Sequence, residues 1–411
     1  KSKTTLIGIE FPSKNGKFYP MPLSSEQDLA KKYHDRFPEQ TFSIGRNGSY
    51  RYSVDIDDSI EQALYVADLI KNNKWEHAVP LEKHRSKNSS WDVIVPSSGG
   101  KDSGFVAHQL KYKYGMNPIT ITWSPLEYTE IGKKNFNSLI QSGISNFLYT
   151  PNGNLQRKLA RLCFEELGDA FHVFVLGQVN FPFHMALKLN INLVFYGENG
   201  ELEYAGDPKH KDKPYKPMSE WTNQHFKGSN FDQLIKFGLK NKNYLKKNDI
   251  KNGDLEFYKI PNLNHLKKAN IKGKYFFSYY KKWTPQENFY YCVDNTGFKP
   301  NDERSEGTYS KYSSLDDKMD GFHYYMRYIK FGLGRSSEEA SHEVRDNHIT
   351  RDEGIKLMNK YEGEFPKKYF KDFLSFLDIN EKQFWSVVDK WRPKHLWKKN
   401  NNKWIFTGKI K

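Results

Sequence analysis

The sequence predicts an α/β protein with a doubly wound parallel sheet. Two observations predict this class: short apolar runs of strand length alternate with helical patterns, and a glycine-rich loop joins the first run to the helix after it. Helical crossovers bring successive parallel strands side by side, with their carboxyl ends at one edge of the sheet. Ligands are therefore expected at that edge.

The first run, Trp91–Val95, is apolar and of strand length. It leads into the loop Pro96–Ser103, of sequence PSSGGKDS, and then into a helical pattern that ends at Gly115. Pro118–Trp123 predicts a second, buried strand, and a second helical pattern ends before Gly143.

The alternation continues along the chain. Phe147–Tyr149 predicts a third strand, and Asn154–Leu167 predicts a helix. Two further apolar runs, Val173–Leu176 and Leu193–Tyr196, predict strands separated by a helical pattern. The repeated strand–helix unit supports the parallel sheet.

The loop after the first strand has the composition of a phosphate cradle. Gly99 and Gly100 allow positive φ and a close approach of backbone N–H groups to an anion, and the following helix adds the positive end of its dipole. Lys101 supplies a charge, while Ser98 and Ser103 supply hydroxyl donors. The longer G-x-x-x-x-G-K-[ST] spacing of kinases and GTPases is absent. A cradle this short suits pyrophosphate as a leaving group.

The string SGGKDS after a strand resembles the signature of the PP-loop ATP pyrophosphatases. Those enzymes activate a carbonyl oxygen as an adenylate, from which a nitrogen or sulfur nucleophile displaces AMP. The resemblance implies an adenine nucleotide alpha hydrolase-like sheet that binds ATP with Mg²⁺. The expected cofactor-binding residues stand at carboxyl ends of strands: Ser97, Ser98, Gly99, Gly100, Lys101, Asp102, Ser103, Trp123 and Gly197.

A second polar cluster follows the run that ends at Tyr196. Its carboxylates, Glu198, Glu201 and Glu203, crowd the end of an apolar strand. Carboxylate oxygens suit a Mg²⁺ that bridges ATP phosphates, and they can also steer an incoming amine. An acidic, glycine-rich turn is the alternative for this stretch alone. When this cluster is considered together with the loop, Lys101, Asp102 and Glu198 are the catalytic candidates. Asp102 and Glu198 are also the candidate Mg²⁺ ligands.

Further motifs extend in order from about Trp91 to about Trp397: Gly177-Gln178, Asn180-Phe181-Pro182, Tyr196–Glu201, Glu306–Tyr309, His323–Met326 and Lys330–Arg335. In these the chain resembles the N-acetyl sugar amidotransferases of bacterial surface-glycan pathways, such as lipopolysaccharide O-antigen, capsule or flagellin glycan. The resemblance implies that ATP and ammonia convert the N-acetyl group of a nucleotide-activated sugar into an acetamidino group. It also implies a separate glutaminase as the ammonia source, often with a cyclase-like companion. Its candidate substrate residues are Gln178, Asn180, Glu201, Glu203, Thr308, Tyr309, Arg335 and Arg345.

The two cysteines, Cys163 and Cys292, lie far apart in apolar stretches and are expected in the core. Members of the resembled family commonly begin with cysteine pairs suited to zinc, whereas this chain has no cysteine before Cys163. No zinc is therefore expected. No nucleophile elbow of the G-x-S-x-G type is present either.

Four regions are expected: an α+β segment at 1–75, the PP-loop domain at 76–206, a lysine-rich insertion for substrate or partner at 207–300, and a helical region at 301–411. Within the first, Gly45–Tyr52 and the residues after it resemble the carboxyl-terminal end of flavin amine oxidase and UDP-galactopyranose mutase folds. No G-x-G-x-x-G loop precedes it, so no flavin is expected. We expect the remnant of a fused upstream domain, with an unrelated strand–turn–helix as the alternative.

The helical region carries three candidate capping signals: Ser336-x-x-Glu339, Thr350-x-x-Glu353 and Asn380-x-x-Gln383. Before them, Leu315, Met319, Phe322, Tyr325 and Met326 form an apolar face that is expected in the core.

The composition predicts an enzyme of the cytoplasm without a membrane partner, because no apolar run spans a bilayer and no signal-peptide pattern follows the start. The net charge of +15 raises nucleic acid as a partner. Between residues 207 and 283, however, the positive charge comes from lysine without arginine, which favours solvated faces. The alternatives are a thiolase-type tRNA-modifying PP-loop enzyme, whose usual paired cysteines are missing, and a non-catalytic nucleotide-binding scaffold.

Overall fold

Six strands in the order β3-β2-β1-β4-β6-β5 form the central sheet of the part of the chain that the structure describes. The structure is a computed structural model that describes residues 89–200, 213–217, 231–241, 244–401 and 403–408. Apart from Tyr112–Tyr114, these residues belong to one compact unit. The predicted segment 1–75 and the candidates Glu201 and Glu203 lie outside the described residues.

The sheet confirms the predicted α/β class. The strands are β1 (Val93–Pro96), β2 (Pro118–Trp123), β3 (Ser145–Tyr149), β4 (Val194–Tyr196), β5 (Tyr215–Pro217) and β6 (Gly273–Phe276). All neighbouring pairs run parallel except β5 with β6, which are antiparallel. The strand order changes direction at β1, so a crevice is expected between the carboxyl ends of β1 and β4.

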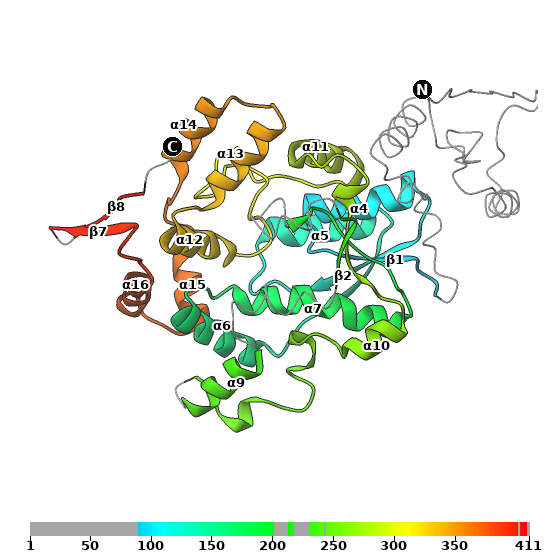
Figure 1. Cartoon of the computed structure of the whole chain (residues 1–411), viewed down its shortest axis with the longest axis horizontal. Coiled ribbons are helices and arrows are strands. Elements are labelled where there is room, and N and C mark those ends of the chain that lie inside the picture. Colours follow the sequence, from blue (N-terminus) through cyan, green and yellow to red (C-terminus); the bar gives the residue numbers. More distant parts are fainter. Residues whose placement is uncertain (1–88, 201–212, 218–230, 242–243, 402, 409–411) are drawn as a thin grey trace, which may run out of the picture. The chain divides into compact units, whose positions relative to one another are not determined.

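Helices cover both faces of the sheet, as Figure 1 shows. On one face lie α4 (Lys101–His108), α5 (Glu130–Gln141) and α11 (Pro285–Thr296). On the other lie α6 (Gly153–Leu167), α7 (His172–Leu189) and α10 (Leu263–Lys268). Shorter elements are the π-helical turn η3 (Gln109–Lys113), α9 (Phe231–Lys240), and the 3-10 turns η6 (Lys247–Asp249), η7 (Glu256–Tyr258) and η8 (Phe277–Tyr279).

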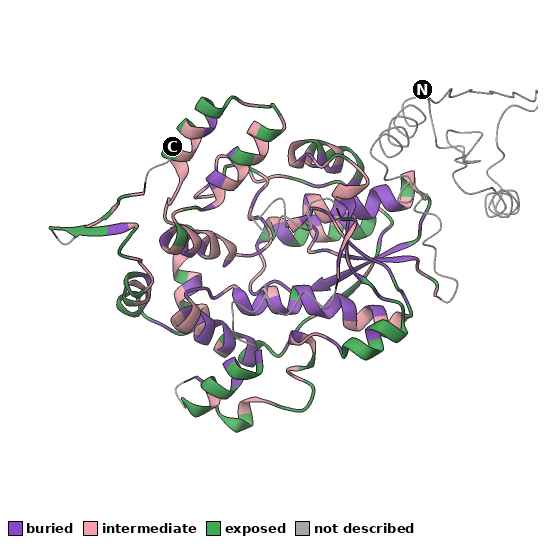
Figure 2. Ribbon diagram, in the orientation of Figure 1, coloured by how far each residue is buried: buried purple, intermediate pink, exposed green. Residues whose placement is uncertain are grey.

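The predicted strand at Val173–Leu176 is wrong, because these residues belong to α7. Val173 and Leu176 are fully buried, and α7 packs against β1, β2 and α6. Figure 2 shows most of this helix as buried. A helix that is apolar on every side lacks the polar face whose spacing separates helix from strand in a sequence.

The lysine-rich region 207–300 completes the sheet with β5 and β6, which the sequence analysis did not predict. Lysines within the strands hide the apolar pattern of this region. Lys216 in β5 is buried, and the Lys274 ammonium in β6 lies 4.0 Å from the centroid of the Tyr196 ring. The same region supplies α11, which packs on α4.

The carboxyl-terminal region is helical, as predicted, and ends in a hairpin. Its elements are α12 (Asp320–Phe331), α13 (Arg335–Arg345), α14 (Arg351–Tyr361), α15 (Phe370–Leu377), α16 (Glu381–Lys390), β7 (Trp397–Asn400) and β8 (Lys403–Phe406). The predicted apolar face from Leu315 to Met326 is buried. No helix within the described residues has the length and apolarity needed to cross a bilayer.

Two of the three predicted capping signals are confirmed. Thr350 and Asn380 each form a reciprocal capping box, at the starts of α14 and α16. The third is wrong, because α13 begins at Arg335 with Gly334 as its N-cap. The Ser336 hydroxyl instead donates to the Gly307 carbonyl at 2.9 Å, a tertiary contact that overrides the local signal.

Candidate active site

The loop Ser97–Gly100 forms a tight turn between β1 and α4. Gly99 has a φ of 94°, which glycine adopts far more readily than other residues. A Cβ atom on Gly99 would lie 2.6 Å from the Cα of Phe136 in α5. The Ser97 hydroxyl accepts from the Gly99 N–H at 3.1 Å and lies 2.8 Å from the Ser103 hydroxyl oxygen. These contacts hold the turn in one shape.

The first turn of α4 presents its N–H groups without a side-chain cap. Gly100 is the N-cap and offers no side-chain acceptor to the helix start. The first N–H groups of a helix have no intrahelical acceptor, and the helix dipole places positive potential there. The start of α4 therefore has the geometry of an anion-binding helix terminus.

Lys101 and Asp102 form a close ion pair at this helix start. The Lys101 side chain is 8% exposed, and its ammonium lies 2.6 Å from Oδ2 of Asp102. The other carboxylate oxygen of Asp102 accepts from the amide of Asn288 in α11 at 3.2 Å. The ammonium also lies 5.4 Å from the centroid of the Tyr312 ring. Contacts from α11 and from the loop before α12 thus orient both side chains.

Two adjoining pockets open beside this ion pair. The loop pocket encloses about 580 Å³, its open mouth included, and is lined by Ser98, Gly99 and Gly100 together with residues of α5 and of the segment before α12. The acidic pocket encloses about 610 Å³ on the same measure and reaches Glu198 after β4. Both pockets share the following lining residues: Lys101, Asp102, Tyr312, Ser313 and Arg335. Glu198 therefore lies in the same pocket as Lys101 and Asp102.

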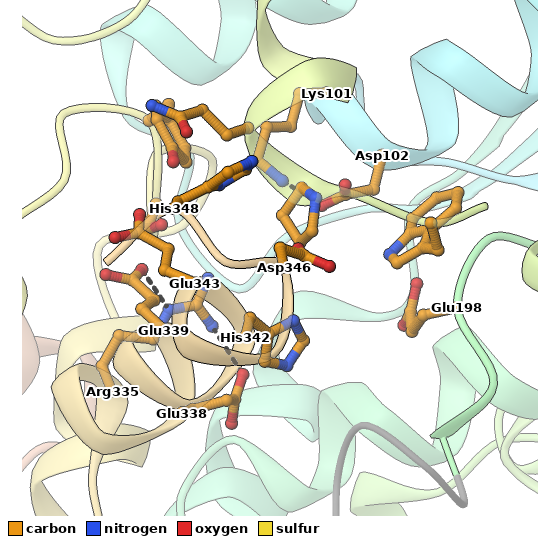
Figure 3. Close-up of a pocket in the computed structure, with 15 residues that line it drawn as sticks. Lys101, Asp102, Glu198, Arg335, Glu338, Glu339, His342, Glu343, Asp346 and His348 are labelled. Atoms are coloured by element: carbon orange, nitrogen blue, oxygen red, sulfur yellow. Dashed lines mark hydrogen bonds and ion pairs between the residues drawn. The ribbon is translucent and has the colours of Figure 1, made fainter. Parts of the chain in front are cut away.

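Carboxylates dominate the acidic pocket, as Figure 3 shows. Its charged and titratable lining residues are Asp102, Glu198, Glu338, Glu339, Glu343, Asp346, Lys101, Arg335, His342 and His348. Most of these come from α13 and the turn after it, far from the loop in sequence. Apart from Arg335, the α13 residues that line this pocket were not predicted as site residues; the helical spacing of the carboxylates on α13 was the available signal.

The carboxylates of α13 compensate the charge of Arg335. Its guanidinium donates to Oε1 of Glu339 at 3.1 Å and to the Tyr324 hydroxyl, and lies 3.7 Å from Glu338. Burial raises the pKa of Glu343, and the neighbouring Glu339 carboxylate raises it further. The pocket thus concentrates negative charge around an arginine that is already paired.

The loop pocket holds a second acidic group that the sequence analysis did not single out. Asp316 and Asp320 line it beside Ser98. Burial raises the pKa of Asp316, as does the nearby Asp320 carboxylate, whereas a hydrogen bond from Ser98 opposes this shift. Among the described residues, no group of three or more His, Cys, Asp or Glu side chains is arranged to hold a metal ion.

The tryptophan that lines the acidic pocket is Trp283 and not the predicted Trp123. Trp123 ends β2, but its ring is 3% exposed, packs among Tyr149, Phe181 and other core side chains, and lines neither pocket. Trp283, which was not a candidate, lines the acidic pocket and packs against Gly197.

Gln178 and Asn180, the candidate substrate residues of α7, lie away from both pockets. Gln178 is exposed on α7 and lines neither pocket. Asn180 is buried, and its amide donates to the Tyr258 carbonyl at 2.8 Å. This contact joins α7 to η7, so the structure gives Asn180 a packing role.

The later candidates differ in how close they come to the acidic pocket. Arg335 lines both pockets, whereas Arg345 is exposed and lines neither. Thr308 is fully buried, and its hydroxyl donates to the pocket residue Glu339. Burial raises the pKa of Tyr309, and the carboxylate of Glu343 raises it further. Thr308 and Tyr309 therefore lie next to the pocket residues Glu339 and Glu343 but do not line the pocket themselves.

The prediction that both cysteines lie in the core is confirmed, since both are buried. Cys292 in α11 donates its thiol to the Lys101 carbonyl at 3.0 Å. Burial raises the pKa of Cys292 to about 12. Its thiol therefore stays protonated at neutral pH and supports the helix start below the loop.

The carboxyl-terminal part of the chain matches a known protein family. Residues 306–411 match the C-terminal domain of WbpG-like LPS biosynthesis proteins. This match fits an enzyme family of glycan biosynthesis. The WbpG-like region contains α12–α16 and the hairpin, and so includes the α13 side chains of the acidic pocket. No curated protein matches the chain.

Proposed function

We propose that the chain is an ATP-dependent amidotransferase that converts the N-acetyl group of a nucleotide-activated sugar into an acetamidino group. The observation that carries the proposal is the loop Ser97–Ser103, which stands at the carboxyl end of β1 and opens on two adjoining pockets. The resemblance of SGGKDS to the PP-loop signature and the WbpG-like match in LPS biosynthesis support it.

In this proposal the loop binds the β- and γ-phosphates of ATP. The free N–H groups at the start of α4 and the Lys101 ammonium neutralise charge that builds up on pyrophosphate as it leaves. The loop pocket then holds the nucleotide, because it lies directly on Ser98, Gly99 and Gly100. The amide oxygen of the sugar attacks the α-phosphorus from the adjoining acidic pocket.

The residues present fit a Mg²⁺ ion that accompanies ATP. Asp102 and Glu198 both line the acidic pocket, and Mg²⁺ in nucleotide sites commonly takes one or two carboxylates besides phosphates. When bound, the ion would neutralise phosphate charge. Asp102 is held ready for this by its contacts to Lys101 and Asn288.

The second half of the reaction replaces AMP by nitrogen. Attack on phosphorus turns the amide into an adenylated imidate; ammonia then adds to its carbon, the carbon–oxygen bond to AMP breaks, and a proton is lost. Ammonia is mostly ammonium at neutral pH, so the carboxylates of the acidic pocket serve to attract the cation and to accept its proton. The amidine product is itself a cation, so the negative charge of these carboxylates also stabilises it.

The described residues support the thiolase alternative less well. Sulfur transfer in PP-loop enzymes normally uses paired cysteines or a cluster, whereas Cys163 and Cys292 are both buried.

The decisive experiment is product analysis. Purified protein is supplied with ATP, ammonium and a panel of N-acetylated nucleotide sugars, and the products are separated and weighed by mass spectrometry. We expect AMP and pyrophosphate in equal amounts with a sugar product in which one oxygen is replaced by NH. Sugar-dependent release of ADP and orthophosphate would contradict the proposal.

Replacing Glu198 with glutamine should impair turnover more than folding. Glu198 lies at the carboxyl end of β4 on the pocket surface, where a carboxylate serves metal or amine chemistry and an amide of the same shape does not. Single-turnover kinetics and thermal unfolding measure the two effects. Unchanged activity at unchanged stability would leave Glu198 as a turn residue only.

The protein should use ammonium directly and fail with glutamine until a glutaminase is added. Glutamine hydrolysis needs an activated nucleophile, usually a thiolate, and both cysteines are buried thiols. We therefore expect amidination at millimolar-range ammonium by the C163S/C292S double variant, provided that circular dichroism shows it folded. Glutamine-dependent amidination by the chain alone, lost in this variant, would be the opposing result.

A further inference from the structure

The indole of Trp283 forms an aromatic wall of the acidic pocket. This residue lies between β6 and α11, is partly exposed, and faces the pocket that holds Lys101 and Glu198. The other described residues that line this pocket are polar or charged, apart from Pro285 and Tyr312. The pocket therefore combines a flat apolar surface with a ring of oxygen acceptors.

The position of Trp283 is set by packing from two sides. A Cβ atom on Gly197 would lie 2.4 Å from the indole ring, so the ring rests directly on the backbone at the end of β4. Phe105 of α4 meets it edge-on, with ring centroids 5.9 Å apart at 74°. The ring is thus fixed beside the first turn of α4, which carries Lys101 and Asp102.

The two pockets differ in the ligand charge that they favour. The loop pocket includes the glycines and the helix start that suit phosphate, beside the carboxyl groups of Asp102, Asp316 and Asp320. The acidic pocket is lined by six carboxylates, with two cations that are both already paired with carboxylates. A phosphate group is repelled there, whereas hydroxyl groups can donate to the carboxylates. An uncharged, hydroxyl-rich ring with one apolar face fits this lining.

We propose that Trp283 is the stacking platform for the pyranose ring of the acceptor sugar and that Gly197 is required to seat it. The inference rests on the proposed function, which supplies the nucleotide-activated sugar. The C–H face of the pyranose covers the indole, the hydroxyls donate to pocket carboxylates, and the acetamido oxygen is directed toward the loop. Burial of the ring face gives Trp283 a share in affinity for the sugar and none in affinity for ATP.

The test is calorimetric titration of the wild-type protein and variants with three kinds of ligand. These are a panel of UDP-linked N-acetylhexosamines, UDP alone, and a non-hydrolysable ATP analogue. We expect Trp283→Ala to bind the sugar nucleotide roughly tenfold more weakly. Its affinities for UDP and the ATP analogue should stay unchanged, and Trp283→Phe should recover most of the loss.

Tyr290→Ala is the matched control, because Tyr290 is an exposed aromatic residue on the neighbouring α11 and lines neither pocket. Gly197→Ala is a second variant with the same expected effect. Its Cβ would displace the Trp283 indole without removing the tryptophan. It should reproduce the selective loss of sugar affinity even where Trp283→Ala proves too unstable to purify.

The outcomes separate this inference from the proposed function. Unchanged sugar affinity in Trp283→Ala and Gly197→Ala would overturn the platform. An equal loss for UDP or for the ATP analogue would also overturn it, because the indole would then hold a nucleobase. Failure of the wild-type protein to bind any panel member, or to bind the ATP analogue, would instead contradict the proposed function itself.

Discussion

Replacing Lys101 with alanine is expected to lower ATP-dependent turnover about 100-fold or more, as for the loss of a preorganised charge at a reacting centre. The ammonium is nearly buried at the start of α4, where little water replaces it. Its removal also leaves the Asp102 carboxylate without its cation, so negative charge rises at the proposed phosphate site. The measurement is single-turnover pyrophosphate release with ATP, ammonium and the sugar nucleotide.

Two controls make the Lys101 result specific. Lys133→Ala removes an exposed lysine of α5 that is paired with the exposed Glu130 and lines neither pocket, and it should leave turnover unchanged. Lys101→Arg keeps the charge and should retain more activity than alanine. Turnover within a few-fold of wild type in Lys101→Ala, with the protein folded, would show that the ammonium does not act on the phosphates.

Replacing Gly99 with alanine should damage both the loop and ATP binding. The residue combines a positive φ with a Cβ position 2.6 Å from the Phe136 backbone, so the turn or α5 must shift. Such backbone strain costs about 1–3 kcal/mol. We expect that loss of unfolding free energy in urea, together with at least a tenfold loss of affinity for a non-hydrolysable ATP analogue.

Gly100→Ala is the matched control for Gly99→Ala. Gly100 has a φ of −69°, and a Cβ there would lie 3.8 Å from the Ser98 hydroxyl oxygen, which is an ordinary van der Waals contact. The fold should therefore tolerate this change with little loss of stability. If the two variants lose the same free energy of unfolding, the left-handed turn at Gly99 is not the source of the loss.

The loop depends on contacts from the lysine-rich region, whose composition did not indicate this role. The lysine-rich region 207–300 supplies α11, from which Asn288 binds Asp102 and Cys292 binds the Lys101 carbonyl. It also supplies β6 beside β4, so it frames the end of the strand that bears Glu198. The region predicted as an insertion for substrate or partner is thus also part of the sheet and of the support of the loop.

The sequence by itself determined the features that depend on neighbouring residues. Strand β2 has the predicted bounds, and the loop after β1 has the predicted glycine turn, because apolar run length and glycine at positive φ are local properties. The capping boxes at Thr350 and Asn380 were predictable for the same reason, since each closes within four residues.

The tertiary structure alone decided what depends on partners far along the chain. Local pattern assigned Val173–Leu176 to a strand, whereas packing between the sheet and α6 makes it helix. It also favoured Trp123 for the site, because Trp123 lies at the carboxyl end of a predicted strand. Only the folded chain places Trp283 there, and only it brings the carboxylates of α13 to Lys101. Such pairings are set by the burial of surfaces that are remote in sequence, and short-range propensity carries no record of them.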